Sequence, residues 1–246
     1  MPVIHAHRGA SAYAPENTLP AFQKALDFHT EGMETDIHLS LDNVFVVCHD
    51  DEIQRTSNGS GSIAQMTVEE LKKFDFGVKF SPEFAGTRIP TLDELLELVH
   101  GMDILNIEIK GPFRPDTDLR AAFDQLYAQL KKFDCVSRTI ISSFGHDWLQ
   151  LLKECHPDLR TGLLYSNSYT PEETVAMVKR RKADAIHPML GCLTPEIMAA
   201  CKENGIKVNV WTVDAPADIE RAIALDPTGI ITNVPDRVQA ALKSKS

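Results

Sequence analysis

The side chains of this sequence that could do chemistry stand in short clusters that lie far apart along the chain. These clusters combine imidazoles, carboxylates and cations, namely His7, Arg8, Glu34, Asp36, His49, Glu108 and Lys110. Residues two apart in a β-strand point to the same face, so Glu34 and Asp36 would lie side by side on a strand. Glu108 and Lys110 have the same spacing. The spacing therefore predicts a site where several charged groups meet.

Three carboxylates that converge without a fixed partner repel one another, and a hard divalent cation relieves that repulsion. Glu34, Asp36 and Glu108 offer the oxygen ligands that Mg²⁺ or Ca²⁺ prefers. Zinc would more often recruit His7 and His49, which is the competing use of those two residues. We therefore expect one divalent cation, Mg²⁺ or Ca²⁺, on the three carboxylates.

Arg8 and Lys110 are the positive charges of the same clusters, and they indicate an anionic substrate. Guanidinium and ammonium groups pair well with phosphate, so we expect a phosphate here. His7 and His49 could then act as general acid and base, because an unperturbed imidazole titrates near neutral pH. Trp211 stands near the end of another apolar run and could either pack in the core or line the substrate cleft.

The elements that must position these residues alternate between strand-like and helix-like segments. Strand-like runs occupy residues 3–7, 33–38, 104–110, 138–144, 160–165, 184–188, 207–213 and 228–233, and helix-like segments lie between them. Eight alternations in 246 residues predict an α/β fold, a parallel TIM (β/α)8 barrel. The competitor, a doubly wound open sheet, would need a Gly-rich turn after its first strand, and no GxGxxG pattern is present there.

Several of the helix-like segments carry recognisable start signals. Thr91 with Glu94 and Thr170 with Glu173 form the pattern of a capping box. Thr18 is predicted to cap the amphipathic segment 18–29. These signals support the positions of the helices that separate the strands.

One long interval, from Asp36 to Asn106, breaks the regular alternation. Residues 39–50 predict a hairpin with Asp42 and Asn43 as its two-residue turn, and this register places His49 directly across from Asp36. Residues 51 to about 88 follow as a polar stretch with a short helix at 67–74. We expect a small insertion after the second strand, and insertions of this kind often shape the active-site face.

The clustered residues occupy the carboxyl ends of the predicted strands, where barrel enzymes place their active sites. His7 and Arg8 end the first strand, and Trp211 lies near the end of the seventh. The second and third strands carry the charged pairs. All of these groups should therefore point into one mouth, with His5 one layer deeper as a packing residue.

Composition limits the remaining possibilities. The chain carries a net charge of −10, which disfavours binding to nucleic acid or to anionic membranes. No run is long enough to insert stably in a membrane, no secretory leader is recognisable, and the five cysteines form no CxxC pair. We expect a single cytoplasmic domain over residues 1–246, with a small-molecule phosphodiester substrate. Nothing in the sequence indicates a particular oligomeric state.

The chain resembles the glycerophosphodiester phosphodiesterase family, in its bacterial cytoplasmic type, over nearly its whole length. The resemblance rests on the order and spacing of ten motifs, each weak alone: HRG (7–9), PENT (15–18), ETD (34–36), HDD (49–51), RTSNG (55–59), IPTLDE (89–94), NIEIK (106–110), SSF (142–144), WTV (211–213) and GIITNVP (229–235). It implies a TIM barrel with a small insertion after the second strand. It also implies hydrolysis of glycerophosphodiesters to an alcohol and sn-glycerol 3-phosphate.

The resemblance also implies roles for the clustered residues. The carboxylates that would bind Ca²⁺ or Mg²⁺ are Glu34, Asp36 and Glu108. The histidines that would act as general acid and base are His7 and His49, and the cations that would bind the phosphate are Arg8 and Lys110. Asp214 stands where the family often has asparagine, and Asn233 stands where aspartate is common. We expect these departures to lie outside the core site. We also expect Glu16 or Asn17 to orient Arg8.

Two other functions remain to be weighed. A related phosphodiesterase that cleaves lysophospholipids would favour an apolar rim, for which the insertion offers Phe74, Phe76, Phe80 and Phe84. A catalytically silent phosphate-binding protein would lack at least one histidine or carboxylate of the set, and none is missing.

Overall fold

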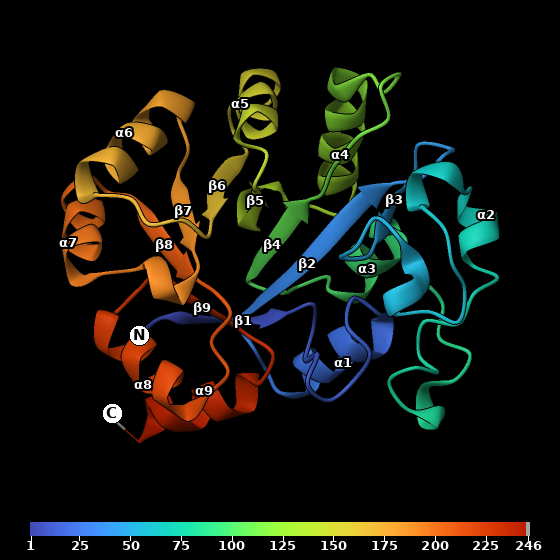
Figure 1. Cartoon of the computed structure of the whole chain (residues 1–246), viewed down its shortest axis with the longest axis horizontal. Helices are drawn as coiled ribbons and strands as arrows, with labels where there is room; N and C mark the ends of the chain where they lie inside the picture. Colours follow the sequence, from blue (N-terminus) through green and yellow to red (C-terminus); the bar gives the residue numbers. More distant parts are fainter. Residues whose placement is uncertain (245–246) are drawn as a thin grey trace.

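A closed barrel of parallel strands forms the centre of the computed structural model, which describes residues 1–244 (Figure 1). Its parallel strands are β1 (Val3–His7), β2 (Gly32–Leu39), β4 (Ile104–Ile109), β5 (Thr139–Ser143), β6 (Arg160–Tyr165), β7 (Ala185–Pro188), β8 (Lys207–Val210) and β9 (Gly229–Thr232). Strand β1 pairs with both β9 and β2, and this second pairing closes the sheet. The eight-stranded TIM barrel predicted from the alternation is therefore confirmed for the described residues.

Helices cover the outside of the barrel between successive strands (Figure 1). They are α1 (Leu19–Asp27), α3 (Leu92–Leu98), α4 (Leu119–Lys132), α5 (His146–Cys155), α6 (Pro171–Arg181), α7 (Pro195–Glu203), α8 (Pro216–Leu225) and α9 (Pro235–Lys243). The short helix α2 (Val68–Leu71) lies instead in the insertion between β2 and α3. Both expected capping boxes form, at the starts of α3 and α6. Thr18 occupies the N-cap position of α1, as predicted, but its hydroxyl donates to the carbonyl of Pro15 (2.5 Å) instead of accepting from the helix.

The hairpin after β2 forms, but its register differs from the prediction by one residue. Strand β3 (Phe45–Val47) pairs antiparallel with β2, and Ile37 faces Val47. The Ser40 amide donates to the carbonyl of Val44, and Asn43 adopts a left-handed φ of 59°, so the loop has three residues. Cys48 therefore lies across from Asp36, and the predicted pairing of His49 with Asp36 is wrong.

Residues 51–88 form a small lobe beside the barrel with an apolar cluster of its own. Short 3₁₀ segments η1 (Ile53–Arg55), η2 (Ile63–Gln65) and η3 (Pro82–Phe84) surround α2 in this lobe, and two further segments, η4 (Val136–Arg138) and η5 (Leu190–Cys192), lie elsewhere in the chain. The buried apolar residues of the lobe, Ile53, Ile63, Leu71 and Phe76, form a cluster separate from the main core. Val46 of β3 and the flanking residues Cys48 and Ile89 complete this cluster. The lobe is thereby anchored to the hairpin that follows β2.

The barrel interior below the mouth contains a polar layer instead of aliphatic side chains alone. His5 and His187 are buried there, and the amide nitrogen of Asn209 lies 3.0 Å from Nε2 of His187. Glycines on neighbouring strands make room for these rings, because a Cβ at Gly32 would lie 2.7 Å from Nδ1 of His5 and one at Gly162 would lie 2.4 Å from Nε2 of His187. His5 is therefore an interior packing residue.

Within residues 1–244, no helix is both long and apolar enough to cross a membrane. The cysteines of the described residues are all free thiols; Cys155 is half-buried, and the other four, Cys48, Cys135, Cys192 and Cys201, are buried. The main core lies between the barrel and the surrounding helices. This core holds the strands in place, while their carboxyl ends remain open to form a site.

Candidate active site

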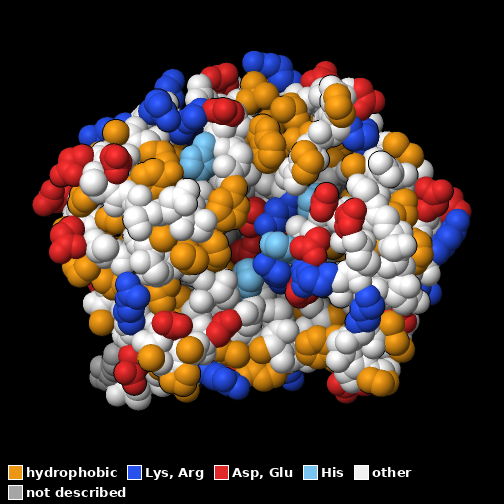
Figure 2. Space-filling model, in the orientation of Figure 1, with side chains coloured by type: hydrophobic (Ala, Val, Ile, Leu, Met, Phe, Trp, Pro, Cys, Tyr) orange, Lys and Arg blue, Asp and Glu red, His pale blue; other side chains and the backbone are white. Residues whose placement is uncertain are grey.

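A cavity of about 240 Å³ opens at the mouth of the barrel, where Figure 2 shows acidic, basic and imidazole side chains gathered in a hollow. Its lining combines the sequence-predicted groups with a few others: His7, Arg8, Glu34, His49, Asn106, Glu108, Lys110, Ser142, Phe144, Leu164, Trp211, Thr212 and Ile231. Asp36 lies directly behind the lining and is almost fully buried. The structure thus brings together all of the residues that the sequence singled out.

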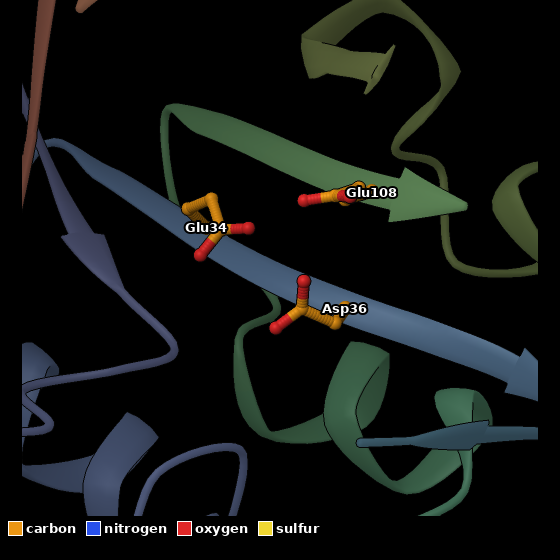
Figure 3. A group of neighbouring side chains, drawn as sticks. All are labelled: Glu34, Asp36 and Glu108. Atoms are coloured by element: carbon orange, nitrogen blue, oxygen red, sulfur yellow. The ribbon is translucent and has the colours of Figure 1, made fainter. Parts of the chain in front are cut away.

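The three carboxylates point toward one another from β2 and β4 (Figure 3). Glu34 and Asp36 lie on one face of β2, and Asp36 pairs in register with Glu108 of β4. One oxygen of each carboxylate lies within 4.8 Å of the others, and all three residues are buried. Carboxylate oxygens at these separations are a donor set that suits a hard divalent cation. The cluster can therefore hold a metal ion.

Burial and mutual repulsion raise the pKa values of two of these carboxyl groups, and neighbouring cations lower the pKa of the third. Burial, followed by the charges of Asp36 and Glu108, raises the pKa of Glu34 well above its usual range. Burial and Asp36 raise the pKa of Glu108 to about 8. Although burial opposes ionisation, the positive charges of Lys110 and Arg8 hold the pKa of Asp36 well below its usual value. An added positive charge at this cluster would favour the ionised forms of Glu34 and Glu108.

Two cations stand directly against the acidic cluster. Lys110 Nζ lies 2.6 Å from Glu108 Oε1 and 3.0 Å from Asp36 Oδ1. Arg8 Nε lies 3.3 Å from Asp36 Oδ2, and the Arg8 amide donates to Glu34 Oε2 (3.0 Å). Both side chains remain partly exposed in the cavity lining. They can therefore meet an anion that enters the mouth.

The turn after β1 depends on a glycine that lets the backbone approach α1. Gly9 has a φ of +80°, and a Cβ there would lie 2.5 Å from the carbonyl carbon of Ala21. No other residue type could occupy this position without moving the helix. The preceding Arg8 also has a left-handed φ of 55°. This turn brings the backbone amide and the guanidinium of Arg8 to the carboxylates at the same time.

His7 ends β1, and its two ring nitrogens face different partners. Nε2 lies 3.8 Å from Glu34 Oε2 on the cavity side, and Nδ1 lies 2.7 Å from Oδ1 of Asn233. Burial and the neighbouring Arg8 lower the pKa of His7 to about 4. His7 is therefore a neutral imidazole in this state of the site.

His49 follows the hairpin and is held by residues of the insertion. Its Nδ1 lies 2.6 Å from Asp50 Oδ1, and Arg55 Nε donates to Asp50 Oδ2 (2.5 Å). Arg55 also donates to both carboxylate oxygens of Glu16 (2.8 Å each), and Glu16 accepts from Arg8 Nη1 (2.9 Å). Arg55 thus links His49 to Arg8, and burial lowers the pKa of His49.

Of the two residues expected to orient Arg8, only Glu16 contacts its guanidinium. Asn17 instead donates to Asp36 Oδ2 (2.8 Å) and accepts from Thr35. Trp211 lines the cavity and donates from Nε1 to the carbonyl of His187 (2.7 Å). Its ring lies edge-on to Phe144 at a centroid distance of 5.8 Å. The side chain that could either pack or line the cleft does both.

Sequence reasoning missed the contact of Asp214 and Asn233 with the site. Asn233 bonds to His7, and its Nδ2 donates to Asp214 Oδ2 (2.5 Å). The expectation that these two departures lie outside the core site is therefore wrong. Their exchange relative to the commoner family pattern was a signal, since an aspartate–asparagine swap at two positions indicates that the positions touch.

A parallel barrel whose mouth combines an acidic cluster with cations and imidazoles has the chemistry of barrel hydrolases that act on phosphate esters. Residues 7–237 match the glycerophosphoryl diester phosphodiesterase family. The chain is 41% identical over 235 residues to a glycerophosphodiester phosphodiesterase of Caldanaerobacter subterraneus subsp. tengcongensis, with 95% of each protein covered.

Solved structures agree with this match. A phosphodiesterase of Oleispira antarctica, in complex with the product sn-glycerol-3-phosphate, superposes with a TM-score of 0.89 at 26% identity, covering 99% of this chain and 97% of the other. A glycerophosphodiester phosphodiesterase of Thermotoga maritima gives a TM-score of 0.79 at 30% identity, with 98% of both chains covered. The chain therefore belongs to the glycerophosphoryl diester phosphodiesterase family and is a phosphoric diester hydrolase.

Proposed function

We propose that this enzyme hydrolyses glycerophosphodiesters to an alcohol and sn-glycerol 3-phosphate, with one divalent cation, Mg²⁺ or Ca²⁺, held by the acidic cluster. The observation that carries the proposal is the meeting of two imidazoles, two cations, Glu34 and Glu108 in one cavity, with Asp36 buried against the two glutamates. The related phosphodiesterase with sn-glycerol-3-phosphate bound supports the same product. A cation held by these carboxylates would neutralise the negative charge that develops on the phosphate.

The cationic side chains hold the phosphodiester in this proposal. Lys110 and Arg8 are already oriented by the carboxylates behind them, so little reorganisation is needed when the phosphate arrives. Trp211 and Phe144 form an apolar wall of the same cavity, against which the glycerol or alcohol part can lie. The substrate is a small molecule, because the cavity is about 240 Å³ in volume.

The histidines move the protons. One of them, His7 or His49, takes the proton of the attacking hydroxyl, which belongs to water or to the substrate's own glycerol, while the new P–O bond forms. The other gives its proton to the leaving alkoxide as the old P–O bond breaks. If the glycerol hydroxyl attacks first, water opens the cyclic phosphate in a second step with the two roles reversed.

The lysophospholipid alternative is not favoured by the position of the phenylalanines in the insertion. Phe76 and Phe74 pack in the lobe's own apolar cluster, and Phe84 lies edge-on to Phe80. Phe80 alone of the four is largely exposed, at 45%. A continuous apolar rim for an acyl chain is therefore not formed by these residues.

The proposal is tested by incubating the protein with glycerophosphocholine and Mg²⁺ or Ca²⁺, with and without a chelator, while sn-glycerol 3-phosphate is assayed. We expect product only with the cation. His7→Ala and His49→Ala should each abolish turnover while thermal unfolding shows an intact fold. Absence of turnover across several headgroups with both cations would refute the substrate, and an active double variant would refute the acid–base roles. The same substrate panel should include a lysophospholipid.

The remaining expectations stay proposals of the same kind. A single barrel domain over residues 1–246 with an insertion at about 51–88 is supported by the anchoring of the lobe to β3. A cytoplasmic location is supported by the free thiols of the described residues.

A further inference from the structure

Nδ1 of His7 contacts a set of hydrogen-bonded polar groups that do not belong to the cavity lining. Asn233 follows β9 and presents Oδ1 to His7 Nδ1 (2.7 Å), and the Ser11 hydroxyl lies 2.6 Å from the same oxygen and 2.8 Å from the carbonyl oxygen of His7. Asn233 Nδ2 donates to Asp214 Oδ2, and Asp214 Oδ1 accepts from the backbone N–H of Asn233 (2.8 Å) and the Thr232 hydroxyl (3.1 Å). Asp214 therefore accepts three hydrogen bonds.

Asp214 determines which way the Asn233 amide points. A carboxylate only accepts hydrogen bonds, so it requires the NH₂ group of the Asn233 side chain to face it. The flipped amide would place two acceptor oxygens against each other at the position of a 2.5 Å contact. It would also turn the NH₂ group toward the Ser11 hydroxyl and His7. The orientation of Asn233 is thereby set by chemistry.

The Asn233 amide in turn selects the tautomer of His7. Its oxygen can only accept, so the Nδ1 atom of His7 that faces it must carry the proton. A neutral imidazole then has its lone pair on Nε2, which is the nitrogen on the cavity side. With the other amide orientation, the lone pair would face away from the cavity.

We propose that Asp214 and Asn233 are positioning residues that hold His7 as the Nδ1–H tautomer, so that Nε2 can take a proton from the attacking group. This assignment rests on the proposed function for the direction of proton transfer. The tautomer itself follows only from the contacts around Asn233. His7 is then the general base of the first step, and His49 is the acid.

The exchange of residue types relative to the commoner family pattern makes the pair testable. Asp214→Asn introduces an NH₂ group that must face either the backbone N–H of Asn233 or the side-chain NH₂ group of Asn233. Both of these groups donate to Asp214 in the wild type. The Asn233 side chain can relieve this conflict by flipping, and its NH₂ group then faces His7 Nδ1. In the double variant Asp214→Asn with Asn233→Asp, position 214 carries the amide and position 233 carries the carboxylate. This carboxylate again accepts a hydrogen bond from Nδ1 of His7.

The experiment compares wild type, Asp214→Asn and the double variant by two readouts. Ring ¹⁵N spectra of histidine-labelled protein, recorded without metal at a pH where His7 is neutral, report which nitrogen carries the proton, and His7→Gln assigns the signal. Steady-state kinetics with glycerophosphocholine and cation report kcat and KM. Asp218→Asn, near the start of α8 and away from the cavity lining, is the matched control.

We expect Asp214→Asn to move the His7 proton to Nε2 and to lower kcat at least about 10-fold with little change in KM, as for other residues that hold a histidine tautomer. The double variant should restore the Nδ1–H signal and most of kcat. Thermal unfolding should be similar in all variants that fold.

Two results would overturn the proposal. One is an unchanged Nδ1–H signal in Asp214→Asn, with kcat close to wild type. The other is a folded double variant that keeps the altered tautomer and the loss of kcat. A wild-type protein that hydrolyses no glycerophosphodiester would instead refute the proposed function, and the metal-free spectra would still decide the role of Asp214 and Asn233.

Discussion

At the scale of the residue, Lys110 balances two buried carboxylates that would otherwise repel. Its ammonium contacts both Asp36 and Glu108 and is only 13% exposed. Removing one partner of a buried ionic cluster leaves the other charges without compensation, which typically costs about 3 kcal/mol or more. Lys110→Met should therefore lower the free energy of urea unfolding by about 3 kcal/mol. Added Mg²⁺ or Ca²⁺ should recover part of that loss by supplying positive charge.

A matched control is Lys132→Met, because Lys132 pairs with Asp93 at the surface and is 61% exposed. An exposed pair contributes less than about 1 kcal/mol, and no cation should change its effect. If the two variants lose the same free energy, the balance of charge around Lys110 is not what stabilises the site.

Glu108 should couple cation binding to pH. Its pKa is raised to about 8, so the carboxyl group is mostly protonated at neutral pH and must lose its proton to become a ligand. We expect the affinity for Ca²⁺, measured by calorimetry, to rise between pH 7 and pH 9 with release of protons. Glu108→Gln should raise the Kd at least about 10-fold and weaken this pH dependence. Glu83→Gln, on the exposed η3 segment, should bind as wild type does, and equal affinities of all three proteins would contradict the site.

At the scale of the element, the 3₁₀ segment η1 ties the insertion to the catalytic mouth. Arg55 at its end contacts Asp50, which holds His49, and Glu16, which holds Arg8. We expect Arg55→Ala to lower kcat by about 10- to 100-fold, because it releases Asp50, the partner of the proposed catalytic residue His49. The loss of unfolding free energy should stay below about 1 kcal/mol, since Arg55 is 46% exposed.

The insertion also offers a control for this prediction. Lys73 lies at the surface of the same lobe and is 66% exposed in its contact with Glu69. Lys73→Ala should change neither kcat nor stability. A kcat of Arg55→Ala within about a factor of two of the control would show that the contacts of Arg55 do not affect catalysis.

At the scale of the whole molecule, the buried histidines of the barrel interior should make stability depend on pH. Burial lowers the pKa of His5 to about 4 and that of His187 to about 3. In the unfolded chain both rings titrate near 6.5, so the unfolded state binds protons first as the pH falls. The contribution of the two neutral rings to the free energy of unfolding should therefore be fully present above pH 6.5. The free energy of unfolding should fall by several kcal/mol as the pH drops toward 4 and below.

Denaturant unfolding as a function of pH measures this slope. His187→Gln should flatten it by up to one proton between pH 6.5 and pH 4, even if the variant is less stable at neutral pH. His100→Gln, at an exposed position, should leave the slope unchanged. A stability that rises on acidification in this range would contradict the neutral, buried state of both rings.

The local features of this chain could be predicted from its sequence because neighbouring residues determine them. The capping boxes at Thr91 and Thr170 form as expected, since a side chain needs only the backbone three residues away. The alternation of β-branched runs and amphipathic segments predicted the barrel. The barrel rule then placed the charged strand ends at one mouth. The two-residue spacing of Glu34 and Asp36 was enough to put both on one face.

Contacts between distant segments were decided by the tertiary structure alone. A single left-handed residue, Asn43, shifts the hairpin register by one, and no local propensity distinguishes the two loops. Asn233 lies 226 positions from His7, and Arg55 lies 39 from Glu16, yet each pair is in hydrogen-bond contact. Sequence spacing carries no information about such contacts until the barrel closes β1 against β9. The sequence by itself therefore determined which groups form the site, and the closed barrel decided which nitrogen, oxygen and charge each one meets.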